Sequence, residues 1–160
     1  MAVTTEAPVI ERMHHWTLVS TDIERTKRWY TEVLGAKPIE RREGGPGGPT
    51  SVTLANVRID FFRTNEEYQP MPGSEGQHHA YAIKQDDWDT WVERFNQFGI
   101  PIRFANMGTS NSMWMTVDDP DGYHIELRVV MDTNRDARGE LLKRGVQFDF
   151  RGNRPQRQNS

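Results

Sequence analysis

The hydrophobic and polar positions of the first sixty residues predict a strand, a helix and three more strands. Residues 14–21 alternate in polarity, which is typical of a strand with one buried face. A helix is predicted from Ile23 to Leu34, because Asp22 can cap its first turn and Gly35 can end its last. Further strands are predicted at 37–41, 51–55 and 57–63, and the glycine-rich segment 43–49 is expected to be a hairpin connection.

The same order of elements is predicted again after residue 77. Residues 78–84 have strand character, and Asp86 or Asp87 can cap a helix whose apolar stripe ends at Gly99. Three strands are then predicted at 101–104, 113–117 and 123–130.

Residues at equivalent places in the two halves are separated by nearly constant offsets. The offset is 63 residues from His15 to His78, 64 from Asp22 to Asp86 and from Gly35 to Gly99, and 66 from Asp60 to Glu126. Such agreement indicates an internal repeat.

A chain that repeats strand, helix and three strands is predicted to form two βαβββ modules, 13–63 and 78–130, joined by a linker at 64–77. The predicted fold class is therefore α+β, with both modules forming one eight-stranded curved mixed sheet around a cleft and the helices outside. Residues 1–12 are expected to form a polar leader, and residues 131–160 a polar C-terminal extension.

Glu126 needs an explanation, because it is an acidic residue in an otherwise apolar strand. The turn chemistry of Asp119-Pro-Asp-Gly122 begins this strand, and the apolar residues that follow alternate with His124, Glu126 and Arg128. A carboxylate on the inner face of a strand is costly unless it is paired or binds a metal.

The repeat predicts which residues meet Glu126 in the cleft. Equivalent positions of the two modules hold His15, Asp60, His78 and Glu126. Two imidazoles with one or two carboxylates suit a divalent transition metal and leave coordination positions open, as in a catalytic site.

Composition narrows the class of protein. Of the 160 residues none is cysteine, which excludes disulfides and thiolate chemistry and fits a reducing compartment, so the chain is expected to be cytoplasmic. No stretch resembles a signal peptide or a membrane span. The net charge is -3, and residues 131–160 hold seven Lys and Arg against four Asp and Glu, so the body of the protein is acidic. An acidic body argues against nucleic acid as a partner.

Four segments together carry a family resemblance: His15–Asp22, Trp29–Gly35, His78–Ile83 and Asp119–Leu127. Over about residues 13–130 the chain resembles the vicinal oxygen chelate superfamily, which contains glyoxalase I, bleomycin- and fosfomycin-resistance proteins, methylmalonyl-CoA epimerase and extradiol dioxygenases. The resemblance implies paired βαβββ modules. It also implies a metal held by the first-strand histidine of each module and by the last-strand carboxylate.

The resemblance also separates the neighbouring histidines. The family places its ligand three residues before a core residue, which selects His15 and His78; His14 and His79 are then expected to point to the opposite face. His124 lies on the same strand face as Glu126, where it can act as an acid–base group or as a partner of a ligand.

Asp60 departs from the family pattern. Four-ligand members such as glyoxalase I have Glu there, whereas extradiol dioxygenases use two histidines and one glutamate, matching His15, His78 and Glu126. Asp60 is therefore a candidate metal ligand or a candidate catalytic residue. Arg58 and Arg128, each two residues from a carboxylate, can hold an anionic substrate.

These features favour a metal-dependent enzyme of extradiol-like dioxygenase type, with Fe(II), acting on a small molecule that chelates the metal through adjacent oxygens. The first alternative is a glyoxalase I-like isomerase or lyase that uses Ni(II) or Zn(II), and Mn(II) is also compatible with the ligand set. A metal-free small-molecule binding protein of the bleomycin-resistance type is the alternative from another class. A homodimer is expected, without a nucleic acid or membrane partner.

Overall fold

A computed structural model describes residues 9–40, 50–66, 77–107, 112–130 and 142–146. The N-terminal module contains β1 (His15–Ser20), α1 (Ile23–Glu32), β2 (Lys37–Pro38), β3 (Thr50–Leu54) and β4 (Val57–Arg63). The C-terminal module contains β5 (His79–Ala82), the 3-10 turn η2 (Gln85–Asp87), α2 (Trp88–Gln97), β6 (Phe104–Met107), β7 (Ser112–Asp118) and β8 (His124–Val130). The predicted order of strand, helix and three strands is thus confirmed in both modules.

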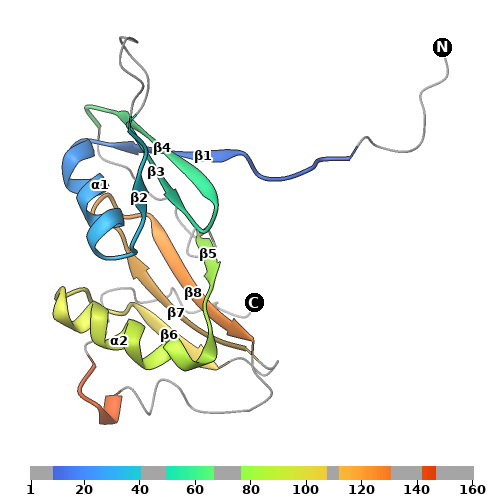
Figure 1. The fold of residues 1–160 in the computed structure, drawn as a ribbon. Coiled ribbons are helices and arrows are strands. Elements are labelled where there is room, and N and C mark those ends of the chain that lie inside the picture. Colours follow the sequence, from blue (N-terminus) through green and yellow to red (C-terminus); the bar gives the residue numbers. More distant parts are fainter. Residues whose placement is uncertain (1–8, 41–49, 67–76, 108–111, 131–141, 147–160) are drawn as a thin grey trace, which may run out of the picture.

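The eight strands are divided between two four-stranded mixed sheets, with the orders β1-β4-β3-β2 and β5-β8-β7-β6. In each sheet the first strand of the module runs parallel to the last, and the other neighbours are antiparallel. Both helices lie outside the sheets (Figure 1), so the predicted α+β class is confirmed. The single eight-stranded sheet expected from the sequence does not form within one chain, because no described strand of one module pairs with a strand of the other.

Alternation in the strands determines which face meets a helix. In the N-terminal module, Leu18, Val52, Ile59 and Phe61 are buried, and Tyr30 of α1 packs on Phe61 with ring centroids 5.5 Å apart. In the C-terminal module, the buried core includes Val92 and Phe95 of α2 with Met115, Ile125 and Leu127 of the sheet. The opposite face of each sheet carries the candidate site residues.

The two modules contact each other at the ends of their helices. Arg94 of α2 donates from Nε to the carbonyl of Val33, 2.6 Å away, and from Nη2 to the carbonyl of Glu32. The C-terminal segment 142–146 also packs on the second module, because Val146 is buried and Arg144 pairs with Asp89 of α2.

Three details of the sequence-based prediction are wrong. The sheet strand expected at 101–104 begins at Phe104, because Pro101 has no N–H to donate to a ladder. Asp87 does not cap α2 through its side chain, because its φ of -87° and ψ of -3° are helical and a capping residue needs an extended backbone. The helix expected to reach Leu34 ends at Glu32, with Val33 as its cap.

Several predictions fall mainly outside the described residues: the leader, the loop 43–49, the linker and the C-terminal extension. No helix in the described part of the chain is long and apolar enough to cross a membrane.

Candidate functional site

The first imidazole–carboxylate pair lies on β1 and β4. Thr17 is the strand partner of Asp60, so His15, two residues earlier, shares the face of the carboxylate. His15 Nε2 lies 4.0 Å from Asp60 Oδ2. Asp60 is only 3% exposed.

Neighbouring side chains hold the Asp60 carboxylate. Ser51 Oγ donates to Oδ1 at 2.6 Å, and Arg58 Nη2 donates to Oδ2 at 2.9 Å. Both distances are typical of strong hydrogen bonds to an ionised carboxylate. The burial of Asp60 is therefore explained without a metal.

The second pair repeats this arrangement on β5 and β8. Ala80 is the strand partner of Glu126, and His78 lies two residues before it, as His15 lies two residues before Thr17. His78 Nε2 is 3.5 Å from Glu126 Oε2, and Glu126 is 5% exposed. The polar neighbour on the other oxygen, Arg128 Nη1, is 3.4 Å from Oε1, near the limit for a hydrogen bond. Glu126 is thus held more loosely than Asp60.

The two pairs do not meet within one chain. Among the described residues, no group of three or more His, Asp or Glu side chains lies where it could hold a metal ion. His15 with Asp60 and His78 with Glu126 therefore form two half-sites on separate sheets, each with the imidazole and carboxylate donors that a divalent metal prefers.

His124 has a carboxylate partner of its own. Its Nδ1 lies 2.7 Å from Asp118 Oδ1, across the hairpin that joins β7 and β8. Arg103 Nη1 donates to the other oxygen of Asp118 at 2.7 Å. A carboxylate on Nδ1 orients the imidazole and leaves Nε2 for a substrate or a proton.

His14 precedes the candidate ligand His15, and His79 follows the candidate ligand His78. Their side chains make different contacts. His79 faces away from Glu126 and stacks on Trp16 of the first module, with ring centroids 3.6 Å apart, and burial lowers its pKa. His14 does not simply point away from His15: its Nδ1 lies 2.8 Å from Nδ1 of His15. His14 lies one residue before β1, where ladder pairing does not impose alternation.

The predicted turn before β8 forms, and it also contacts the first module. The N–H of Gly122 donates to the carbonyl of Asp119 at 3.1 Å, and Gly122 has a φ of 91°, which glycine adopts without strain. Asp119 accepts from the N–H groups of Asp121 and Tyr123, each at 2.9 Å, and from Tyr30 Oη of α1 at 3.1 Å. Burial raises the pKa of Asp119 from 3.8 to about 6, and that of Tyr30 well above its usual value.

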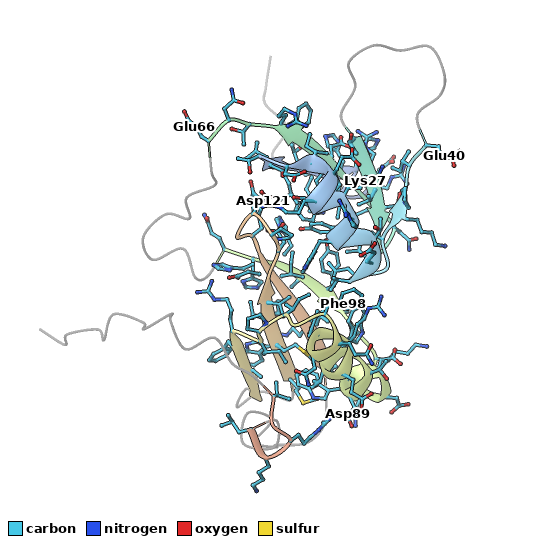
Figure 2. All side chains as sticks on the ribbon, turned by 90° about the vertical axis from the view of Figure 1, so that its left-hand side faces the viewer. Lys27, Glu40, Glu66, Asp89, Phe98 and Asp121 are labelled. Carbon is cyan, nitrogen blue, oxygen red and sulfur yellow. The ribbon has the colours of Figure 1, made fainter. Side chains whose placement is uncertain are left out.

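The tip of this turn lies beside α1 (Figure 2). Asp121 Oδ1 accepts from Arg25 Nη2 at 2.7 Å, and its other oxygen accepts from the hydroxyl of Thr26. The turn that begins the Glu126 strand is therefore fixed against the helix of the other module.

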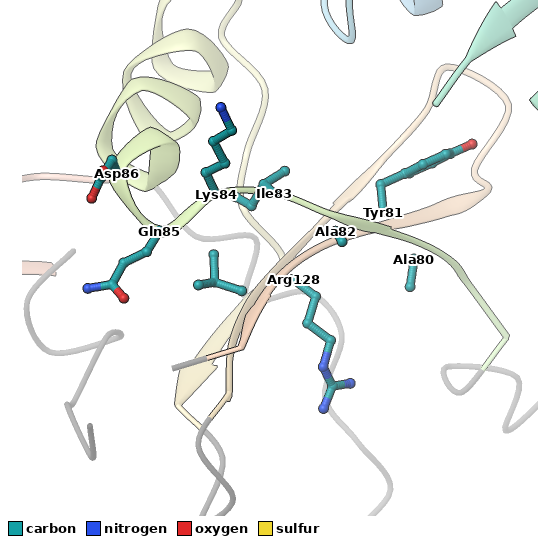
Figure 3. A pocket seen from close by; sticks show the side chains of 9 residues that line it. Ala80, Tyr81, Ala82, Ile83, Lys84, Gln85, Asp86 and Arg128 are labelled. Atoms are coloured by element: carbon teal, nitrogen blue, oxygen red, sulfur yellow. The ribbon is translucent and has the colours of Figure 1, made fainter. Parts of the chain in front are cut away.

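A recess with a volume of about 660 Å³ lies along β5 and the start of η2. Figure 3 shows Ala80, Ala82 and Arg128 pointing to the same side of the strands. Ala80 is the strand partner of Glu126 and Ala82 that of Arg128, so this side is the face of the second half-site. The small alanine side chains leave space beside it.

Sequence reasoning missed several residues that act on the site. Asp118 could have been found, because a turn at Asp119–Gly122 places residue 118 opposite residue 124. Ser51 and Tyr30 could not, because strand register and helix packing bring them to their carboxylates.

Comparisons with known proteins agree with this architecture. The family model described as Glyoxalase/Bleomycin resistance protein/Dioxygenase superfamily matches residues 12–127. Glutathione transferase FosA of Serratia marcescens is 24% identical over 122 residues, 76% of this chain and 82% of that protein.

Solved structures show a similar fold. A mutant of the fosfomycin resistance protein FosX from Listeria monocytogenes, in complex with Mn(II) and 1S,2S-dihydroxypropylphosphonic acid, has a TM-score of 0.66 at 16% identity, covering 78% of this chain and 95% of that chain. Lactoylglutathione lyase from Agrobacterium tumefaciens has a TM-score of 0.56 at 16% identity, covering 75% and 94%.

Proposed function

Because the chain belongs to the glyoxalase/bleomycin resistance protein/dioxygenase superfamily, we propose that it is a divalent-metal enzyme that acts on a small substrate bearing adjacent oxygen atoms. The observation that carries the proposal is the presence of two half-sites with unequal carboxylates: Asp60 is held tightly and Glu126 loosely. We assign His15, His78 and Glu126 as the three protein ligands, a set that leaves positions for a chelating substrate.

A second copy of the chain completes the site in this proposal. The half-sites of one chain do not meet, yet each lies on the first and last strands of its module, and both β1 and β5 are at the edge of a sheet. In a two-fold symmetric homodimer, β1 of each copy can lie beside β5 of the other, which gives two identical sites. One site would then take His15 from one copy and His78 with Glu126 from the other.

The residues around Glu126 supply the remaining chemistry. A bound divalent ion would polarise the substrate oxygens as a Lewis acid. His124 is held through Nδ1 by Asp118 and lies on the Glu126 face of β8, so its Nε2 can donate or accept the substrate proton. Arg128, half exposed on the same face, can neutralise an acidic group of the substrate.

We favour addition of a nucleophile or transfer of a proton as the reaction. Similarity to a glutathione transferase, a fosfomycin resistance protein and a lactoylglutathione lyase supports this choice. The Asp118–His124 pair supports it too, because both reactions need a positioned acid or base.

The extradiol dioxygenase predicted from the sequence is the second candidate. The hydrogen bonds from Ser51 and Arg58 to Asp60 favour the dioxygenase. With Asp60 bound in this way, two histidines and one carboxylate remain as ligands, a set that suits Fe(II). Purification without added metal under anaerobic conditions separates the candidates. Manganese, nickel or zinc without oxygen uptake on catechol-type substrates supports our preferred reaction; bound iron with stoichiometric oxygen uptake overturns it.

A complementation experiment tests the shared site. Differently tagged chains carrying His15→Ala and Glu126→Ala are co-expressed, and the mixed dimer is purified through both tags. A site shared between chains predicts one intact site per mixed dimer, and so about half of the wild-type metal content, while each parental variant binds none. Metal-free mixed dimers would show that each site lies within one chain.

A further inference from the structure

The short arm that precedes β1 exposes apolar side chains. Val9, Ile10 and Met13 are 88%, 90% and 64% exposed. Figure 1 shows this segment leaving the body of the molecule in line with β1. Single exposed apolar residues are ordinary on a protein surface, but three within five residues of an extended arm indicate an interaction surface.

The recess along β5 lies beside an edge of the sheet. Among the described strands β5 pairs with β8 alone, so its outer edge presents backbone N–H and C=O groups that no described strand pairs. Ala80 and Ala82 are exposed and small, and the recess runs on to Asp86. An added strand can pair with such an edge.

The geometry of the shared site brings the two features together. β1 and β5 are the corresponding edge strands of the two modules, and in the contact proposed below they run antiparallel between the copies. If β1 of one copy lies beside β5 of the other, the residues before His15 run alongside the residues after His78. Residues 9–13 precede His15 by two to six positions, and residues 80–86, which line the recess, follow His78 by two to eight.

The alternation of side chains along the arm and along β5 indicates which residues would face each other. In an extended arm Val9, Glu11 and Met13 share one face, and Ile10 and Arg12 share the other. On β5 and β8, Ala80, Ala82 and Arg128 share the face of the second half-site. Apolar arm residues would thus meet alanines, and the Glu11 carboxylate would approach the Arg128 guanidinium.

We propose that residues 9–13 of one copy lie antiparallel to β5 in the recess of a second copy. This inference rests on the shared site of the proposed function. The arm would close the outer side of the cleft that holds the substrate, next to Arg128.

Cross-linking tests the contact, and the absence of cysteine from the chain makes it selective. One tagged chain carries Glu11→Cys and a differently tagged chain carries Ala82→Cys; the mixed dimer is treated with a short bis-maleimide. We expect a covalent dimer that contains both tags. The matched control replaces Ala82→Cys by Gln97→Cys, an exposed position at the end of α2, and should give little product. Equal yields at both positions, or none at Ala82→Cys, would overturn the proposal.

Failure of the arm contact and failure of the shared site give different results. If complementation restores metal but the Glu11→Cys and Ala82→Cys chains do not cross-link, the arm contact alone is wrong. If no mixed dimer forms, both are wrong. As a second measurement, Val9→Asp and Met13→Asp should each weaken dimerisation at least about ten-fold in sedimentation experiments, because a charge would enter the recess. Unchanged dimerisation in both variants would also count against the contact.

Discussion

The two half-sites have the same architecture but differ at the position two residues before the carboxylate. In the first module this position is Arg58, which donates to Asp60 at 2.9 Å. In the second it is His124, which bonds to Asp118 instead and leaves Glu126 with neighbours at 3.4 and 3.5 Å. Corresponding positions of the internal repeat thus differ in their bonding, and Asp60 has closer hydrogen-bond donors than Glu126.

The strand opposite this position differs in the same sense. Thr53 is the partner of Arg58, whereas Asp118 is the partner of His124. Arg58 faces the uncharged Thr53 and therefore pairs with Asp60 of the same strand. His124 faces Asp118 and pairs with it across the hairpin. The difference teaches that the partner of the basic residue in each module decides whether that residue also holds the strand's carboxylate.

The largest expected effect comes from exchanging the two carboxylates for amides. Glu126→Gln should lose both bound metal and activity, because a ligand is removed. Asp60→Asn should keep most of its metal, with a loss of affinity no greater than the roughly 10- to 100-fold that an outer partner contributes. Metal analysis of both purified variants measures the difference. Equal metal loss in the two variants would show that both carboxylates are metal ligands. An Asp60→Glu variant more active than the wild type would favour a four-ligand enzyme.

The next largest effect is expected at His124 and its partner Asp118. His124→Ala should lower turnover by roughly 10²- to 10⁴-fold with metal retained, as for the loss of an acid–base group. Asp118→Asn should lower it less and alter the pH dependence, because the imidazole loses only its orienting carboxylate. Steady-state rates against pH test both, with Arg103→Gln, which changes the other partner of Asp118, as the matched control. Full activity in His124→Ala would remove His124 from the mechanism.

The two hairpin turns should respond differently to pH. The β3–β4 turn at Ala55 and Asn56 has positive φ at both residues, whereas the β7–β8 turn contains the buried Asp119. Because the pKa of Asp119 is raised to about 6 in the folded state, the folded protein binds this proton more tightly than the unfolded chain does. Its contribution to the free energy of unfolding is therefore present below about pH 4 and is lost as the pH rises through 6.

The size of this loss is at most about 3 kcal/mol, from roughly 1.4 kcal/mol per pKa unit. Urea unfolding of the wild-type protein and of Asp119→Asn at pH 4, 5, 6 and 7 measures it. The difference in the free energy of unfolding between the wild type and Asp119→Asn should change between about pH 4 and pH 6 and then become constant. Asn56→Ala, in the other turn, should shift stability by the same amount at every pH. Parallel curves for wild type and Asp119→Asn would contradict the assignment.

The smallest effects are expected at the two neighbouring histidines. His14→Ala should reduce metal affinity about ten-fold, because the imidazole that contacts His15 Nδ1 would be lost. His79→Ala should leave metal affinity nearly unchanged and instead reduce stability, because its ring stacks on Trp16 between the modules. Metal titration and thermal unfolding distinguish the two. Loss of metal in His79→Ala alone would place the ligand one residue later than assigned.

Local pattern and repetition predict much of this fold. The offset between His15 and His78 predicted equivalent positions in the two modules, and each histidine indeed lies two residues before the strand partner of a carboxylate. The turn at Asp119–Gly122 and the Asp22 cap, which accepts from the N–H of Arg25, also follow from local chemistry.

Other features depend on how the modules pack, which a repeat does not specify. An offset cannot say whether equivalent residues meet in one chain or between two, so the separation of the half-sites was not predictable. The tight engagement of Asp60 depends on Ser51, which β-strand register brings to it from the preceding strand. The orientation of His14 reflects its place just outside the ladder.

The parallel pairing of the first and last strands also has a consequence for folding. β1 can pair with β4 only after the 36 intervening residues 21–56 have been ordered or looped out, and β5 with β8 only after the 41 residues 83–123. Contacts between residues so far apart in the sequence form late, because the chain loses the entropy of closing the loop before these contacts stabilise it. Each imidazole therefore reaches its carboxylate near the end of its module's folding, and during synthesis the first module can complete this step before the second has emerged. A metal bound at the proposed site would then enter a protein that has already folded, rather than guide the chain to its structure.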